Sequence, residues 1–157
     1  MEPEIKKYMA SCSQLVWAKD GYEWGREDRE GSDCSGSVHY GLVGAGFIRP
    51  ARLTADGYFK EYFTKDVTED NIQNMDEIMA VFYVAVKDWN KLDGTPMLAG
   101  SCRHVTPVIG RYVVLHADWH KDALYPATAK YVREVYEGIN CKALWRKLDW
   151  TKLARSV

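Results

Sequence analysis

The sequence predicts a single α+β domain in which a helix that begins at a cysteine packs against a small antiparallel sheet. Apolar residues recur at helical spacing over residues 38–45, directly after Cys34. Two short runs rich in β-branched residues, 104–109 and 112–116, are separated by a glycine-containing turn and predict a hairpin. The 157 residues, 46% of them hydrophobic, contain no repeat, linker or low-complexity run, so we expect one domain, 1–157.

The N-terminal residues predict a helix of about four turns. Pro3 suits the first helical turn, where its missing N–H is not needed. Apolar side chains follow at helical spacing: Ile5, Met9, Cys12 and Val16. We expect this helix to pack on the one that begins at Cys34.

The second helix places Cys34 in its first turn. Ser32 or Asp33 is available as N-cap, and Gly46 ends the helix. Unpaired N–H groups and the positive end of the helix dipole favour a thiolate there, and the same amides can stabilise an oxyanion. The structural alternative is a small packed cysteine that lies at a helix start.

Residues 78–83 predict an apolar strand, and the segment 87–103 after it is long and rich in turn residues. We expect this segment to form a lid over one side of a cleft. Trp89 is its expected contact with a substrate, and simple packing beside the strand is the alternative for that side chain.

The hairpin determines whether two histidines can meet. A three-residue loop, 109–111, pairs Val108 with Tyr112 and therefore places His104 opposite His116, on one face of the sheet. A two-residue loop sends the two rings to opposite faces. A proline within the first strand indicates an edge or a bulge, which changes the parity again.

The C-terminal region, 119–157, predicts a helix followed by a tryptophan-rich tail. Tyr131 and Val135, with Tyr136, mark the helix after a proline. The tail at 144–150 carries two tryptophans, which we expect to pack against the domain. A partner or oligomer contact is the alternative, because tryptophan is enriched at binding hot spots.

Four short motifs in this order resemble the NlpC/P60 family of papain-like cysteine peptidases, whose best-known members cut the stem peptides of bacterial cell walls. The motifs are Tyr22-Glu23-Trp24-Gly25, Asp33-Cys34-Ser35-Gly36, His104-Val105 and His116-Ala117. The resemblance is strongest over 15–118. The chain departs from the family where a Gly-Asp pair usually opens the strand before the base, and where the base motif usually continues as His-Val-Gly.

The resemblance implies a papain-like α+β fold and assigns roles to six residues. The catalytic residues are Cys34 as nucleophile, His104 as general base and His116 as the group that orients that base. Residues that hold the substrate are Tyr22, Asp33 and Ser35. Each of the latter has a structural alternative: a half-buried aromatic, a helix cap and a first-turn hydroxyl. If the hairpin register slips, His120 replaces His116. We expect His39, one turn into the helix, to have no role.

The implied activity is hydrolysis of a peptide or amide bond through an acyl-thioester, in a peptidoglycan stem peptide near a γ-D-glutamyl linkage. An acyltransferase or amidase on the same scaffold is the nearest alternative, and a non-catalytic module that binds cell wall or a partner comes from another class. No cofactor is expected. The oligomeric state stays open.

The charge balance and the apolar stretches of the sequence bear on binding of nucleic acid and on membrane insertion. With 21 basic and 22 acidic residues the formal charge is -1, so we expect no nucleic acid partner. No apolar stretch has the length of a membrane span, and the first residues lack a signal-peptide core. We expect a soluble chain that reaches a cell wall by export, on a phage particle, at lysis or with a signal removed.

The four cysteines have two further possible uses. They allow two disulfides in three pairings, which their spacing does not favour, since Cys34 must stay free. A zinc site is the sharper rival: Cys102 and His104 lie two apart on one predicted strand, and Cys34 and His116 would complete a tetrahedron. No Cys-x-x-Cys motif is present, and we expect no metal.

Overall fold

The computed structural model describes residues 2–18, 21–23, 25–28, 31–72, 75–90 and 94–154. Trp24 of the first motif and Asp93 of the predicted lid lie outside these ranges. The elements follow in this order: α1 (Glu2–Gln14), η1 (Leu15–Trp17), β1 (Glu27–Asp28), β2 (Gly31–Ser32), α2 (Cys34–Gly44), α3 (Ala55–Glu61), β3 (Lys65–Asp66), η2 (Glu69–Asn71), β4 (Met79–Ala85), β5 (Trp89–Asn90), β6 (Pro96–Met97), β7 (Cys102–Gly110), β8 (Val113–Asp118), β9 (Ala123–Thr128), α4 (Ala129–Glu137), β10 (Cys141–Lys147) and η3 (Trp150–Lys152).

A six-stranded sheet forms the centre of the described structure, with strand order β3-β10-β4-β7-β8-β9 and antiparallel neighbours throughout. Residues 144–147 of the predicted tail belong to strand β10, which pairs with β4 along its whole length, and Trp150 begins η3. Trp145 is buried and Trp150 packs against the larger core, so both tryptophans pack against the domain as expected. The sequence did not predict strand β10, because pairing with β4 is a non-local contact that leaves no local signal.

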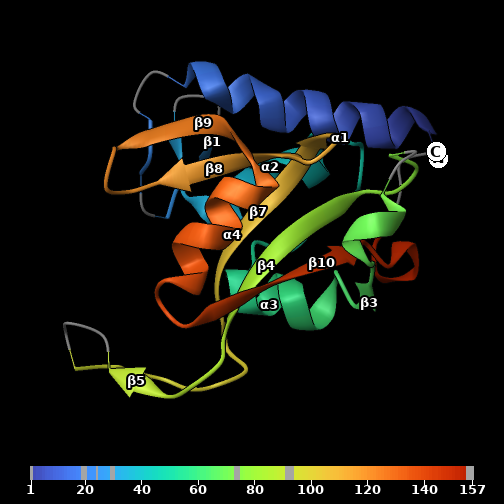
Figure 1. The fold of residues 1–157 in the computed structure, drawn as a ribbon. Helices are drawn as coiled ribbons and strands as arrows, with labels where there is room; N and C mark the ends of the chain where they lie inside the picture. Colours follow the sequence, from blue (N-terminus) through green and yellow to red (C-terminus); the bar gives the residue numbers. More distant parts are fainter. Residues whose placement is uncertain are drawn as a thin grey trace.

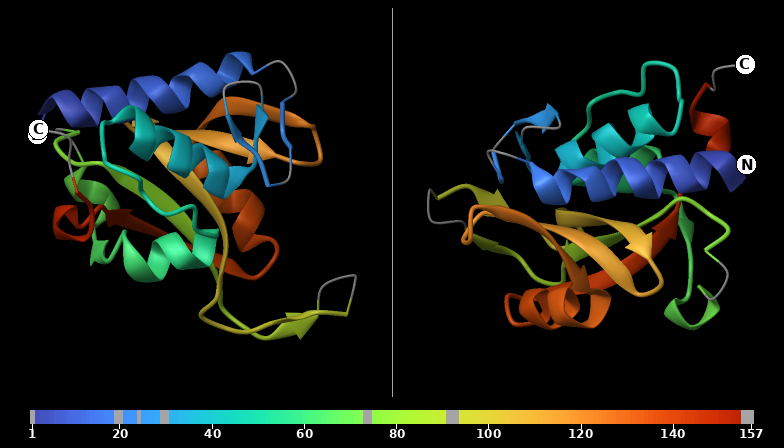
Figure 2. Two further views of the ribbon diagram at one scale, coloured as in Figure 1. Left: turned by 180° about the vertical axis from the view of Figure 1, so that it is seen from behind. Right: turned by 90° about the horizontal axis from the view of Figure 1, so that it is seen from above.

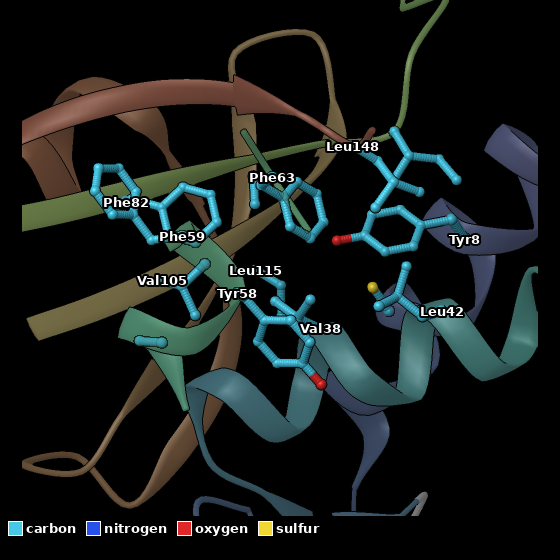
Figure 3. Close-up of a cluster of buried hydrophobic side chains, with 14 of the residues drawn as sticks. Tyr8, Val38, Leu42, Tyr58, Phe59, Phe63, Phe82, Val105, Leu115 and Leu148 are labelled. Atoms are coloured by element: carbon cyan, nitrogen blue, oxygen red, sulfur yellow. The ribbon is translucent and has the colours of Figure 1, made fainter. Parts of the chain in front are cut away.

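Helices cover both faces of the sheet (Figures 1 and 2). On one side lie α1, α2 and α3, which enclose the larger hydrophobic core with residues such as Phe82, Val105 and Leu115 (Figure 3). On the other side, α4 closes a smaller core around Val81, Tyr83 and other residues. Because both faces are covered, every residue of β4 is buried, and the strand is a continuous apolar run rather than an alternating one.

The N-terminal helix packs on α2, as the sequence predicted. The two helices approach closely at Gly41, where an added Cβ would lie 2.4 Å from the sulfur of Cys12 and 2.8 Å from the ring of Tyr8. Both side chains are fully buried. A glycine is therefore required at this position of α2 by close approach and not by backbone conformation.

Helix α4 confirms the predicted C-terminal helix but presents a different face to the sheet. Val132 is fully buried, whereas Tyr131 and Val135 are largely exposed. The buried positions, Ala129, Val132 and partly buried Tyr136, follow the i, i+3, i+7 spacing of one helix face. The apolar residues on the opposite face misled the sequence pattern.

The hairpin of β7 and β8 combines two of the alternatives that the sequence left open. Gly110 pairs with Val113 across a two-residue turn, in which Tyr112 has a φ of 57°. A bulge between Val108 and Gly110 then shifts the register, so that Val108 pairs with Val114 instead of Tyr112. The bulge restores the parity that the short turn would have reversed. Both histidines therefore share one face, although not through a three-residue loop.

Part of the predicted lid is a small hairpin of β5 and β6, with Trp89 paired to Met97. It projects from the body of the domain (Figure 1). Residues 91–93 at its tip lie outside the described residues. Trp89 packs over the guanidinium of Arg103, with 4.6 Å between Cζ and the ring centroid.

We expect Gly41→Ala to destabilise the domain by up to about 2 kcal/mol, because overpacking costs about 1–3 kcal/mol and the gain in helix propensity offsets about 1 kcal/mol of it. Urea unfolding followed by circular dichroism measures this. Val43→Ala, at an exposed position of the same helix, serves as control and should change stability little. An unfolding midpoint for Gly41→Ala at or above that of the parent chain would contradict the packing shown.

Candidate active site

The N-terminus of α2 is built around Asp33. As N-cap, Asp33 accepts a hydrogen bond from the Gly36 amide at Oδ1 (2.7 Å), and its Oδ2 accepts one from the Gly25 amide (2.7 Å). The carboxylate therefore joins the preceding loop to the first turn of the helix. Cys34 is the first helical residue, as the sequence predicted, and keeps part of its surface exposed.

Arg52 completes this corner. Its guanidinium donates to Asp33 Oδ1 (2.8 Å), to the hydroxyl of Ser35 (2.7 Å) and to the carbonyl of Leu53 (2.8 Å). Asp33 and Ser35 are both largely buried. The residues on either side of Cys34 are thus held in place by an arginine from the segment before α3.

The sulfur of Cys34 lies where β7 and β8 separate. Pairing between these strands is confined to the end near their turn, at Val108 and Gly110 of β7. In the described structure β7 does not pair with β8 beyond this end, and the Cys34 thiol lies close enough to the Val105 amide for that amide to lower its pKa.

The two predicted histidines meet in the same region. His104 Nε2 and His116 Nδ1 are 3.1 Å apart, within hydrogen-bond distance, and both rings are buried. On the far side, His116 Nε2 lies 3.8 Å from Asp118 Oδ2, which also accepts a hydrogen bond from the hydroxyl of Tyr125 (2.8 Å). His120 is exposed and contacts Asp118 only through its backbone amide, at 3.1 Å. The ring beside His104 is therefore that of His116.

Aromatic rings hold His104 from the side of α4. The ring of Tyr136 stacks on His104 with 4.8 Å between centroids and 4° between planes. Tyr83 lies against both rings, at 4.7 Å from Tyr136 and 5.5 Å from His104. The hydroxyl of Tyr83 is in turn 3.1 Å from that of Thr106. His104 therefore has little freedom to rotate.

The proposed nucleophile and the histidine nearest to it lie in one pocket of about 620 Å³. Cys34 and His104 line it together with all three predicted substrate-holding residues, which are Tyr22, Asp33 and Ser35. His116 lies behind His104 and does not line the pocket. The exposed Trp119, on the turn after β8, forms part of the opposite rim.

Burial sets the protonation states of the unliganded site. It raises the pKa of the Cys34 thiol to about 11, and the nearby Asp33 carboxylate acts in the same direction. The Val105 and Ser35 amides and Arg52 oppose this shift without reversing it. The sequence-based expectation of a thiol that ionises unusually easily was therefore wrong for the resting site. The cost of removing the sulfur from water outweighs the stabilisation at the helix terminus.

Burial also lowers the pKa of both histidines below the ordinary value of 6.5. For His104 the neighbouring His116 and Arg103 add to the shift, and for His116 the Asp118 carboxylate partly offsets it. The resting site thus holds a neutral thiol and two neutral imidazoles.

The arrangement of Cys102 differs from the one that a zinc site requires. A bulge at Arg103 lets Cys102 pair with Val84 and His104 with Tyr83. Cys102 therefore faces the larger core while His104 faces the smaller one, although the two residues are only two apart. In the described part of the chain no group of three or more His, Cys, Asp or Glu side chains could hold a metal ion, and all four cysteines are free thiols.

Some residues of this region were missed by sequence reasoning. They are Arg52, Arg103, Trp119, Tyr125, Tyr136 as a contact of His104, and Asp118. Asp118 had a usable signal, because a residue two positions after His116 on a strand shares its face. Arg52 and Tyr136 had none, since each meets its partner only through the tertiary fold.

The fold has known counterparts among solved structures. The P60 domain of antigen MAP1204 from M. avium subspecies paratuberculosis is similar over 93% of this chain and 95% of that domain, with a TM-score of 0.54 and 19% identity. NlpC1 from Trichomonas vaginalis is similar over 91% of this chain, with a TM-score of 0.54 and 15% identity. This chain has the NlpC/P60 fold. It spans 43% of the length of NlpC1.

The likeness to NlpC/P60 structures lies in the fold and not in extended sequence identity. No family model matches the chain, and no curated protein matches it significantly. The predicted NlpC/P60-like α+β architecture is confirmed. In the described residues, no helix is both long and apolar enough to cross a membrane.

The lowered histidine pKa values predict that stability falls in mild acid. The folded state binds protons less readily than the unfolded state, so the stabilisation is complete above pH 6.5 and is lost as the pH falls below that value. The loss should approach about 1.4 kcal/mol per pH unit for each histidine. Urea unfolding at several values between about pH 8 and about pH 5 measures how steeply the free energy of unfolding falls with pH.

His104→Gln and His116→Gln should each reduce this slope. His120→Gln is the matched control, because the ring of His120 is exposed in the folded state. An equal slope in all three variants would show that the two buried imidazoles do not titrate as the structure implies.

Proposed function

We propose that this chain hydrolyses peptide or amide bonds by covalent catalysis, with Cys34 as nucleophile, His104 as general base and His116 as the orienting group. The observation that carries the proposal is the 3.1 Å contact of the two imidazoles beside a cysteine at a helix N-terminus, with Cys34 and His104 in one pocket. A nucleophile, a base and a group that orients the base are the parts that such a mechanism needs.

The hydrogen-bond order supports a specific set of tautomers. If Asp118 favours a proton on His116 Nε2, then His116 Nδ1 is free to accept a hydrogen bond from His104 Nε2–H. His104 Nδ1 then carries a lone pair and is the atom that takes the thiol proton. Asp118 acts on the base through His116 and is a positioning residue.

The reaction starts from a neutral pair and not from a thiolate. As the Cys34 sulfur attacks the carbonyl carbon, its proton passes to His104 Nδ1, so charge separates only when the bond forms. The backbone amide of Cys34, at the start of α2, helps to stabilise the oxyanion. The imidazolium of His104 returns the proton to the leaving amine. Water then cleaves the acyl-thioester with His104 again as base, which releases the acid and restores the thiol.

Three side chains border the position of the substrate. Burial raises the pKa of the Tyr22 phenol, and Cys34 is the next cause, which indicates that the hydroxyl lies near the sulfur. Asp33 and Ser35 line the same pocket, but both are bonded to Arg52. We propose that Tyr22 contacts the substrate directly and that Asp33 and Ser35 do so as part of a unit that includes Arg52.

The proposed substrate is a peptidoglycan stem peptide, cleaved near a γ-D-glutamyl linkage, as the resemblance to cell-wall hydrolases implies. An acyltransferase or amidase would use the same steps, with a different acceptor in place of water. A binding module without turnover is the alternative from another class. The assay measures the release of new amino groups from purified wall fragments with and without the protein. Release that depends on the protein indicates hydrolysis, and binding without release indicates a binding module.

Cys34→Ala should abolish turnover of these fragments while leaving the fold intact, because Cys34 lies at the edge of the pocket and its loss leaves only a small gap. Cys12→Ala, which removes a buried thiol outside the pocket lining, is the control and should keep activity. Circular dichroism accompanies both assays. Appreciable turnover by Cys34→Ala would exclude the covalent mechanism, and fragment binding without turnover by the parent chain would favour the binding module.

Asp118→Asn should lower kcat between about 10-fold and 100-fold with little change in KM, since it weakens the preference for the required tautomer without touching substrate. Tyr125→Phe should have a smaller effect of the same kind. Asp122→Asn, in the adjacent turn and exposed, is the isosteric control. If Asp118→Asn changes stability but leaves kcat and its pH profile as in the control, Asp118 has only a structural role.

A further inference from the structure

Arg103 lines the pocket at an irregularity in β7. It is the bulged residue between Cys102 and His104, whose partners on β4 are adjacent residues. A bulge re-aims a side chain relative to the regular alternation of a strand. Cys102, Arg103 and His104 all line the pocket, and the charge of Arg103 contributes to the lowered pKa of His104.

Arg103 differs from the other charged residues lining the pocket because it forms no ion pair with a described residue. Arg52 is paired with Asp33 at 2.8 Å, and Asp56 is paired with Lys60 at 2.8 Å. No acidic side chain among the described residues forms an ion pair with Arg103. The pocket therefore contains one cation that the described part of the chain does not neutralise.

Trp89 holds this cation in position. Its ring covers one face of the Arg103 guanidinium at 4.6 Å. The neighbouring Cys141 sulfur also contacts the group, but it is an uncharged thiol whose pKa is raised by burial. Stacking uses the face of a guanidinium and leaves N–H donors in its plane for a planar anion.

We infer that Arg103 recognises a carboxylate of the substrate close to the scissile bond. The inference rests on the proposed function and names a chemical class for its substrate: a peptide or amide that carries a free carboxylate beside the bond to be cleaved. A γ-linked glutamyl residue has such a group, since its α-carboxylate is not used in the linkage. An amidated form of the same residue lacks the charge.

Alkylation of Cys34 tests this without a known substrate. Iodoacetate and iodoacetamide differ only in carboxylate against carboxamide, and the ratio of their rates at Cys34, divided by that for free N-acetylcysteine, cancels changes in thiol ionisation. Arg103→Gln should lower this ratio by roughly fivefold or more, the effect of one charge-assisted contact. Arg103→Lys should retain part of it. Arg111→Gln, an exposed arginine in the β7–β8 turn, is the control and should not change it. Mass spectrometry assigns the labelled cysteine.

The outcomes separate the two proposals. A ratio that is the same in the parent chain, Arg103→Gln and Arg111→Gln, with Cys34 still labelled, overturns carboxylate recognition and leaves the proposed function standing. A Cys34 that neither reagent labels in the folded parent chain counts against the proposed function, and the inference falls with it.

A competition experiment on the parent chain serves if the variants do not fold. A dipeptide whose C-terminal D-glutamate carries its γ-carboxyl as an amide and its α-carboxylate free should protect Cys34 from iodoacetamide at lower concentration than the form in which both carboxyls are amides. Equal protection by the acid and the amide overturns the inference.

Discussion

The arrangement of this site depends on the separation of β7 and β8 beyond their turn. If pairing continued along both strands, no gap would remain beside β7 for the first turn of α2. Because pairing stops next to Pro107, the thiol of Cys34 can approach the backbone of β7 from the side of the larger core. The two histidines meet at 3.1 Å where backbone pairing has ended, and their contact connects the separated strands.

Irregularities of β7 place the remaining groups. The bulge between Val108 and Gly110 keeps His104 and His116 on one face despite a two-residue turn. The bulge at Arg103 sends Cys102 and His104 to opposite faces and places Arg103 in the pocket lining. In a regular strand, side chains alternate strictly between the two faces of the sheet. The bulges in β7 break this alternation and so change which way individual side chains point.

Burial shifts the pKa values of the thiol and of the imidazole beside it in opposite directions. It makes ionisation of the Cys34 thiol harder and protonation of His104 harder, so it disfavours a resting thiolate–imidazolium pair. The same low polarity strengthens each interaction with charge that develops during reaction. Among the charged groups, Asp118 partly offsets the lowered pKa of His116, whereas Arg103 adds to the lowering of the pKa of His104. A substrate carboxylate at Arg103 would change that balance.

The sequence by itself determined the parts whose cause is local. Asp33 caps α2 because the side chain of an N-cap residue reaches an amide three positions ahead, and this puts Cys34 in the first turn. The apolar runs of β4, β7 and β8 and the helix after β9 were likewise visible in residue spacing. The sequence allowed His104 and His116 to share a face, but it left open which turn and bulge would place them there.

Only the tertiary structure decided which distant groups meet. Strand β10 pairs with β4 far along the chain, Arg52 reaches Asp33 across 19 positions, and Tyr136 stacks on His104 from α4. The resting pKa of Cys34 also belongs here, because desolvation depends on everything packed around the sulfur and not on its neighbours in sequence. Local spacing specifies the backbone of each element, whereas contacts between elements depend on bulges, register and packing that a one-dimensional pattern does not encode.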